Sequence, residues 1–166
     1  MRAFHKADRI VAVSKTTRDE IASVDPDAAA RTRVAMQGIS PDFHVMKGEE
    51  GERLVAMARR RWAHGAPRYV LTVGQFSGYK NHETVVRAFA RAFGKEADVH
   101  LVMVQRLGQG PRVLRPIARE LGVDERIHFV RDIPLVELVA LYNGALALCH
   151  PSLYEGFGNP VSEAIA

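Results

Sequence analysis

One pattern, which starts at residue 68, constrains the fold more than any other feature of the sequence. Four short apolar runs are each followed by a turn and by a segment with helical periodicity. The runs read RYVLTVG, VHLVMV, RIHFV and ALALCH. Strands that are apolar throughout are typical of parallel sheets buried on both faces. The sequence therefore predicts an α/β fold, a Rossmann-like parallel sheet with helices on both faces.

Two of the helical segments carry a clear apolar stripe, which predicts the face that each helix turns to the sheet. The stripe after the first run consists of Val85, Ala88, Phe89, Ala92 and Phe93. The stripe after the second run consists of Leu114, Ile117, Ala118 and Leu121.

The first part of the chain stands outside this alternation. DRIVAVS reads as a strand, KTTRDEIASV as a helix and TRVAMQGI as another strand, and ISPDF reads as a turn. So few elements cannot build a domain core of their own. We therefore expect residues 1–40 to be the tail of a preceding domain with its linker, and residues 41–166 to be a domain truncated at its carboxyl terminus.

Charge and composition exclude several classes of protein. The net charge is +4, but the basic residues are scattered, as in ARRRW and RAFAR, and this favours solvated helix faces over a nucleic-acid partner. Attraction to an anionic membrane surface or to an anionic substrate stays open. A single cysteine, no long apolar run and no signal peptide predict a cytoplasmic protein, with peripheral association at the inner face of the membrane as an open alternative.

Chemistry is expected where the strands end, because ligands of open parallel sheets bind beyond the carboxyl ends of the strands. Four loops meet this condition: GQFSGYKN, QRLGQGP, RDIP and HPSLYEGFGNP. The histidines at positions 5, 64, 82, 100 and 128 show no metal-ligand spacing, so surface or core packing is expected for them in place of a metal site. No cofactor is predicted.

The last loop holds an unusual set of residues. Asn159 suits the cap and Pro160 the first turn of a helix, and the sequence predicts Glu163 in that first turn. Gly156 and Gly158 permit positive φ and close backbone approach, so free N–H groups could face a phosphate or a sugar oxygen. Carboxylates such as Glu155 and Glu163 accept hydrogen bonds well from sugar hydroxyls.

The segment YEGFGNPVSEA, with two glutamates separated by seven residues, resembles the signature of the retaining GT-B glycosyltransferases known as glycosyl transferases group 1. Other segments agree in order. ADRIVAVSKTTRDEI is similar to the end of the family's amino-terminal domain, VLTVGQFSGYKNHETVVRAFA to the opening of its nucleotide-binding domain, and HFVRDIPLVELVALYNGA to its base-binding segment. The resemblance implies the carboxyl-terminal half of a GT-B fold, in incomplete form.

The resemblance also implies roles for individual residues. Glu163 would hold the ribose hydroxyls of a nucleotide sugar, and Lys80 would meet its diphosphate. The predicted catalytic residues are Lys80 and Glu155, the latter beside the donor sugar ring. The remaining predicted donor-binding positions are Gly74, Gln75, Arg131, Asp132, Gly156, Phe157, Gly158 and Asn159.

The sequence departs from the family pattern at two positions. Many members have an arginine after the first glycine or just before the lysine, and this chain has Gln75 and Tyr79 there. A neutral amide does not replace the charge of a guanidinium group. Arg106 in the neighbouring loop could substitute for it, or it could be a plain surface residue.

The implied activity is transfer of a hexosyl group from a nucleotide-diphosphate sugar, UDP- or GDP-linked, to a glycan or lipid-linked acceptor. The family retains the anomeric configuration and needs no obligatory metal. Since acceptor groups belong to the amino-terminal domain, we expect the chain alone to bind a nucleotide weakly and to transfer no sugar. The base, the sugar and the acceptor stay open.

Three alternative functions compete with glycosyl transfer. A glycoside hydrolase would also use two carboxylates, but it has no need of phosphate-suited loops. A nicotinamide dehydrogenase is disfavoured, because GQG is only part of the dinucleotide fingerprint and no acidic residue ends RIHFV. A non-catalytic nucleotide-binding or interaction fragment stays open as the non-enzyme alternative.

Overall fold

The computed structural model describes residues 5–104 and 108–166. The chain divides into two compact units. The first unit comprises Met1–Ile39 and Glu155–Asn159, and the second comprises Ser40–Tyr154 and Pro160–Ala166. The assignment of these parts to domains of a larger protein stays a prediction.

The first unit is built around two short parallel strands. Ser14 caps its longer helix, since the Ser14 hydroxyl accepts a hydrogen bond from the Thr17 N–H at 3.1 Å. Asp25 caps the shorter helix in the same way, accepting from the Ala28 N–H at 2.9 Å. The elements in chain order are β1 (Ile10–Ala12), α2 (Lys15–Val24), α3 (Pro26–Ala30) and β2 (Thr32–Val34).

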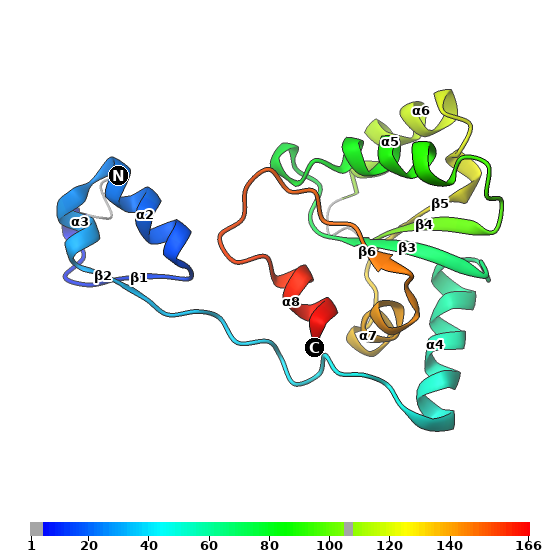
Figure 1. Ribbon diagram of the computed structural model, residues 1–166, viewed down its shortest axis with the longest axis horizontal. Helices are drawn as coiled ribbons and strands as arrows, with labels where there is room; N and C mark the ends of the chain where they lie inside the picture. Colours follow the sequence, from blue (N-terminus) through cyan, green and yellow to red (C-terminus); the bar gives the residue numbers. More distant parts are fainter. Residues whose placement is uncertain (1–4, 105–107) are drawn as a thin grey trace. The chain divides into compact units, whose positions relative to one another are not determined.

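The second unit contains a parallel sheet of four strands in the order β5-β4-β3-β6 (Figure 1). All three neighbouring pairs are parallel, which confirms the predicted α/β fold class. The fourth strand is shorter than ALALCH suggests, because only Ala147 and Leu148 pair with β3. The strands are β3 (Arg68–Val73), β4 (Val99–Val104), β5 (Ile127–Val130) and β6 (Ala147–Leu148).

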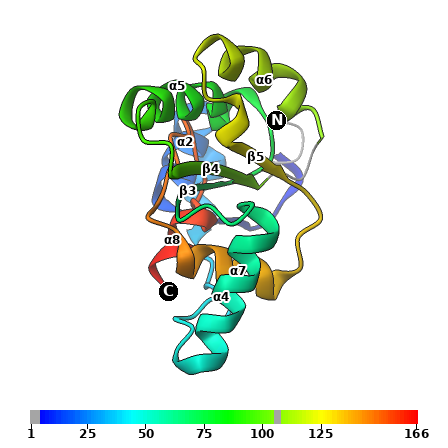
Figure 2. The ribbon, with the colours of Figure 1, turned by 90° about the vertical axis from the view of Figure 1, so that its right-hand side faces the viewer.

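Helices cover both faces of this sheet, as Figures 1 and 2 show from two directions. One face carries α5 (His82–Phe93) and α6 (Gly110–Glu120), and the other carries α4 (Gly48–Trp62) and α7 (Leu135–Gly144). Each face has its own buried apolar cluster, so the sheet lies between two cores. Three short helices complete the unit: η1 (Gly78–Lys80), η2 (Asp124–Arg126) and most of α8 (Asn159–Ile165).

The buried stripe of α5 differs in part from the predicted one. Val85 and Phe89 are buried as predicted, but Ala88 and Ala92 are exposed, and Val86 is buried in their place. The stripe is centred on the large side chains, which bring more apolar area into the core than alanine does. The two alanines fall on its solvent side.

The stripe of α6 also differs from the prediction at one position. Leu114 and Ala118 are buried and Ile117 packs partly against them, as predicted. Leu121 is 36% exposed, because α6 ends at Glu120 and Leu121 lies beyond its last turn.

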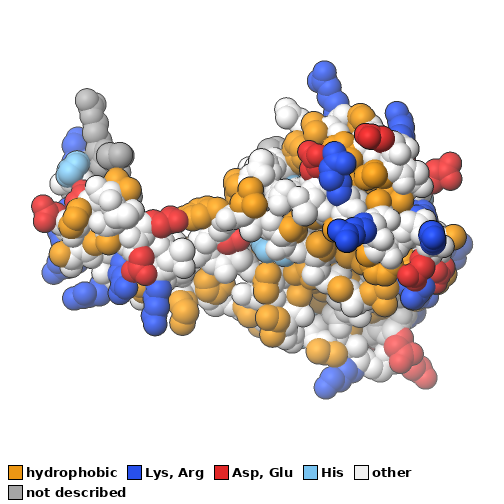
Figure 3. Space-filling view, turned by 45° about the horizontal axis from the view of Figure 1, so that its top comes forward, with side chains coloured by type: hydrophobic (Ala, Val, Ile, Leu, Met, Phe, Trp, Pro, Cys, Tyr) orange, Lys and Arg blue, Asp and Glu red, His pale blue; other side chains and the backbone are white. Residues whose placement is uncertain are grey.

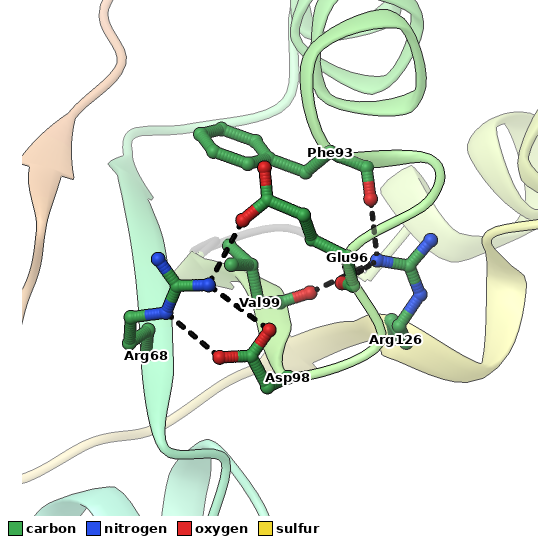
Figure 4. Close-up of polar contacts among 6 residues, drawn as sticks. All are labelled: Arg68, Phe93, Glu96, Asp98, Val99 and Arg126. Atoms are coloured by element: carbon green, nitrogen blue, oxygen red, sulfur yellow. Dashed lines mark hydrogen bonds and ion pairs between the residues drawn. The ribbon is translucent and has the colours of Figure 1, made fainter.

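Two arginines stabilise the amino-terminal ends of β3 and β4 through ion pairs and hydrogen bonds (Figure 4). Arg68, at the start of β3, pairs with Asp98 at 2.8 Å and with Glu96 at 2.8 Å. The Arg126 guanidinium donates to the backbone carbonyls that close the end of α5 and the start of β4. The carbonyls that Nη1 reaches belong to Phe93, Glu96 and Val99.

On the face of the second unit that Figure 3 shows, basic side chains are interspersed with acidic and apolar ones. No helix in residues 5–104 and 108–166 combines the length and the apolar character that crossing a membrane requires.

Candidate functional site

The four loops that the sequence points to start at one edge of the sheet. Since β3, β4, β5 and β6 are parallel neighbours, their carboxyl ends meet at the same edge. In α/β sheets this edge is where ligands bind. Of the loop after β4, residues 105–107 lie outside the described part of the chain, so the predicted role of Arg106 stays a prediction.

The loop after β3 brings two predicted site residues together. A methyl group added at Gly74 would touch the Cδ and Cε atoms of Lys80 at 3.8 and 3.9 Å. Lys80 ends the short helix η1, and its ammonium lies 5.4 Å from the ring centroid of Tyr79. Gln75, which follows Gly74, is exposed. A cation therefore lies beside a glycine at the carboxyl end of β3.

Asn81 joins this loop to the loop after β6. Its backbone is left-handed, with φ of 55°, and its side-chain amide donates to the Pro151 carbonyl at 3.4 Å. The Leu153 N–H donates to the Tyr79 carbonyl at 2.8 Å. The sequence reasoning passed over Asn81, although asparagine tolerates left-handed backbone better than most residues and directly follows Lys80.

A buried histidine lies under the same loop. His82 is 4% exposed, and its ring centroid lies 5.7 Å from that of Phe76. Burial, with the nearby Lys80 and His150, lowers the pKa of His82, so its ring is neutral at pH 7. Within the described residues, His82 Nδ1 and Ser77 Oγ are buried without a hydrogen-bond partner. The prediction treated His82 only as a surface or packing residue.

The loop after β5 lies against the loop after β4. A methyl group added at Gly108 would come within 2.6 Å of Arg131 Nη1, so a side chain at position 108 would displace the guanidinium. Asp132 has a left-handed backbone with φ of 53°. Arg131 and Asp132 are both exposed, and their predicted place beside the base stays a prediction.

The residues from Glu155 to Asn159 belong to the first unit. Gly158 takes positive φ, at 84°, as predicted. Gly156 does not, and a methyl group added there would make an ordinary van der Waals contact with Val13 Cγ2 at 3.4 Å. Phe157 is half-buried. The geometry of this segment toward Lys80 stays a prediction.

Glu163 lies one residue later in its helix than predicted. Because α8 begins at Asn159 itself, Glu163 is its fifth residue and lies outside the first turn. Its carboxylate accepts a hydrogen bond of 2.6 Å from the Tyr142 hydroxyl. Both side chains line a small cavity of about 70 Å³. A larger groove of about 560 Å³ lies between α4 and α7, and none of the predicted site residues line it.

No group of three or more histidine, cysteine, aspartate or glutamate side chains in the described ranges is arranged to hold a metal ion. Among the described residues of these loops, Lys80 and Arg131 are the cationic side chains.

A comparison with known protein families assigns the chain to a family. Residues 57–166 match the family model of the glycosyl transferases group 1. The chain belongs to this family. It is also 34% identical over 119 residues to the D-inositol 3-phosphate glycosyltransferase of Corynebacterium glutamicum (strain R), an alignment that covers 67% of this chain and 28% of that protein.

Solved structures confirm the GT-B fold of this group 1 glycosyltransferase chain. Anabaena Alr3699/HepE in complex with UDP and glucose superposes with a TM-score of 0.80 at 17% identity, over 98% of this chain and 43% of that one. WaaG, a glycosyltransferase involved in lipopolysaccharide biosynthesis, superposes with a TM-score of 0.78 at 21% identity, over 99% and 45%. The chain thus spans less than half the length of each of these relatives.

Proposed function

We propose that the chain is the donor-binding part of a retaining hexosyltransferase that uses a nucleotide-diphosphate sugar. The observation that carries the proposal is the pairing of Lys80 with Gly74 at the carboxyl edge of β3. A small residue lets phosphates come close to the backbone, and an ammonium group beside it supplies the opposite charge. The bound UDP of the structural neighbour Alr3699/HepE supports a UDP- or GDP-linked donor.

The chemical demand of this reaction is charge stabilisation. In the proposed step an acceptor hydroxyl oxygen bonds to the anomeric carbon and the bond from that carbon to the diphosphate oxygen breaks. Negative charge grows on the leaving diphosphate, which takes up the acceptor's proton. In the proposal Lys80 stabilises that charge through its ammonium group, with no metal ion. Glu155 lies by the sugar ring, Glu163 accepts from the ribose hydroxyls, and the backbone around Arg131 and Asp132 borders the base.

The acceptor half of the reaction is proposed by family likeness alone. A glycan or lipid-linked acceptor fits the WaaG relative, whose description names lipopolysaccharide biosynthesis. Work on such acceptors would bring the protein to the inner face of the membrane from the cytoplasm, and this location stays a prediction.

A second candidate function is a non-catalytic nucleotide-binding or interaction module. Gln75 and Tyr79 favour it, because both stand where many family members have a phosphate-binding arginine. A nucleotide-binding module would share the donor site with the first candidate, an interaction module would not need it, and only the first candidate transfers the sugar. Restored transfer on joining this chain to a complete acceptor domain would select the enzyme.

Thermal shift with UDP, GDP, ADP and NAD, in the absence of added metal, tests the donor site. We expect one nucleoside diphosphate at about 100 times its Kd to stabilise the protein by ~2.7 kcal/mol. For a chain of this length that raises Tm by several degrees, at about 2–4 °C per kcal/mol. Glu163→Ala should reduce the shift, and NAD should give none. Stabilisation by NAD alone, or by no diphosphate, would contradict the proposal.

A further inference from the structure

The carboxylate of Glu163 is held by a residue that no sequence motif points to. Tyr142 lies near the end of α7, and Glu163 lies in α8, which runs beside α7 in both ribbon views (Figures 1 and 2). The Tyr142 hydroxyl donates to Glu163 Oε2 at 2.6 Å. This length is typical of a hydrogen bond from a hydroxyl to an ionised carboxylate, one of the stronger classes.

Tyr142 is itself fixed in place. The ring of Phe43 meets the Tyr142 ring edge-on, with centroids 5.7 Å apart and an interplanar angle of 81°. The neighbouring Asn143 amide accepts from the Met46 N–H at 2.9 Å and donates to the His44 carbonyl at 3.0 Å. These hydrogen bonds hold the segment that carries Phe43 against α7, so the Tyr142 ring has little freedom to rotate away from Glu163.

The hydroxyl of Tyr142 stays protonated at neutral pH. Burial, and then the hydrogen bond with Glu163, raise the pKa of Tyr142 far above its ordinary value. A phenol that stays protonated beside a carboxylate can only donate to it. The direction of this hydrogen bond is therefore fixed.

One oxygen of Glu163 remains available for a ligand. Within residues 5–104 and 108–166, Oε2 accepts from Tyr142 and Oε1 has no hydrogen-bond partner. Glu163 is only half-buried and lines the small cavity with Tyr142, Phe43 and Val139. A carboxylate anchored at one oxygen holds the other in a defined direction, which lowers the entropy lost on binding a hydroxyl.

We propose that Tyr142 is a positioning residue, which orients Glu163 to accept hydrogen bonds from the ribose hydroxyls of the donor. The inference rests on the proposed function, because it assigns a ribose to Glu163. Tyr142 acts through Glu163 and does not touch the nucleotide. Loss of such a residue should lower the affinity for ligands that carry ribose hydroxyls and should leave the affinity for ligands without them unchanged.

The test uses Tyr142→Phe, which keeps the ring and its edge contact with Phe43 and removes only the hydroxyl. Calorimetry would measure the affinities of the whole chain for UDP, GDP and ADP and for their 2′,3′-dideoxy counterparts. For the preferred base we expect the variant to bind the diphosphate about tenfold more weakly, which is ~1.4 kcal/mol. We expect its affinity for the dideoxy counterpart to be unchanged.

Glu163→Gln is the second variant, and it keeps the test valid if Tyr142→Phe folds poorly. It removes the charge at the other end of the same hydrogen bond and should give the same selective loss. The double variant should lose no more than the larger single loss, since groups that act as one unit are not additive.

Three results would overturn the inference. An unchanged diphosphate affinity in Tyr142→Phe would do so, and so would an equal loss for the ribose and dideoxy ligands, which indicates a merely structural role. A wild-type chain that binds ribose and dideoxy ligands equally, or binds neither, would overturn the proposed donor site as well. That last result needs no variant, so it is distinguishable from the first two.

Discussion

Among single residues, Lys80 carries the charge on which the proposed chemistry depends. Lys80→Ala should weaken UDP binding by at least about tenfold, because interactions with a charged group contribute about 1.5–3 kcal/mol. Affinity for uridine, which lacks the diphosphate, should not change. Calorimetry with both ligands measures the difference. Lys95→Ala, which removes an exposed lysine of the same unit, is the matched control. An equal loss for uridine would show that the substitution disturbs the fold instead.

His128 makes the stability of the protein depend on pH. It is 8% exposed, its ring stacks on His64 with centroids 4.2 Å apart, and its Nε2 lies 2.7 Å from His100 Nδ1. Burial, and then His64, His100 and Arg115, lower the pKa of His128 to about 4. Below pH 6.5 the unfolded chain therefore binds a proton that the folded chain does not. The contribution to stability is complete above pH 6.5 and is lost as the pH falls toward 4.

Urea unfolding between pH 7.5 and pH 4 measures this effect. The free energy of unfolding should fall by up to ~3 kcal/mol from His128 alone. His128→Gln should flatten the curve over this range, whereas His44→Gln, at an exposed position, should leave it unchanged. Parallel curves for the wild type and His128→Gln would refute the assignment.

Between elements, the packing of α7 on α4 and β3 depends on one glycine. A methyl group added at Gly144 would lie 2.7 Å from the Tyr69 hydroxyl and 2.9 Å from Val55 Cγ1. Tyr69 is fully buried, and its hydroxyl donates to the Leu141 carbonyl at 2.7 Å, so it cannot move aside without losing that bond.

Gly144→Ala should therefore destabilise the protein by about 1–3 kcal/mol, as overpacked core sites do. The measurement is the urea midpoint at pH 7.5. Gly78→Ala is the control, because a methyl group there would have no atom within 4 Å. A midpoint for Gly144→Ala equal to that of the control would show that the helix shifts without cost.

The sequence predicts an element well when the pattern that determines it lies within one short segment of the chain. RYVLTVG and VHLVMV predict β3 and β4 closely, because a continuous apolar run reports burial on both faces. Gly74 and Lys80 lie in one loop, so their proximity was predictable too. The contacts of Tyr142 with Glu163 and of Gly108 with Arg131 join different loops or helices, and no local pattern reports them.

Two predictions were wrong because a local sequence pattern did not decide the outcome. Ala88 and Ala92 satisfy helical periodicity, but side-chain volume decides which face of α5 is buried. Glu163 was assigned to the first helical turn because a cap at Asn159 looked favourable, and the helix begins at Asn159 instead. Helix boundaries depend on such one-residue choices.

Across the whole molecule, the two units should differ in stability. In the described residues the buried core of the first unit consists of Ala12, Ile21 and Ala28, whereas the second unit has an extensive core on each face of its sheet. A small core offsets little conformational entropy.

Hydrogen exchange followed by mass spectrometry should show this difference. Amides of α2 should exchange at least about a hundredfold faster than amides of β3 and β4, a difference of ~2.7 kcal/mol in opening free energy. Equal protection of the two units would show that they open together.

The strand order of the second unit has a consequence for synthesis on the ribosome. β4 and β5 add successively on one side of β3, and β6, which is made after both, joins the other side at Val70 and Leu71. Until residue 148 has left the exit tunnel, that side of β3 offers unpaired backbone groups between apolar side chains. Unpaired strand edges of this kind recruit other chains. Ribosomes that stall between β5 and β6 should therefore yield nascent chains that depend on chaperones, and the dependence should end once β6 is complete.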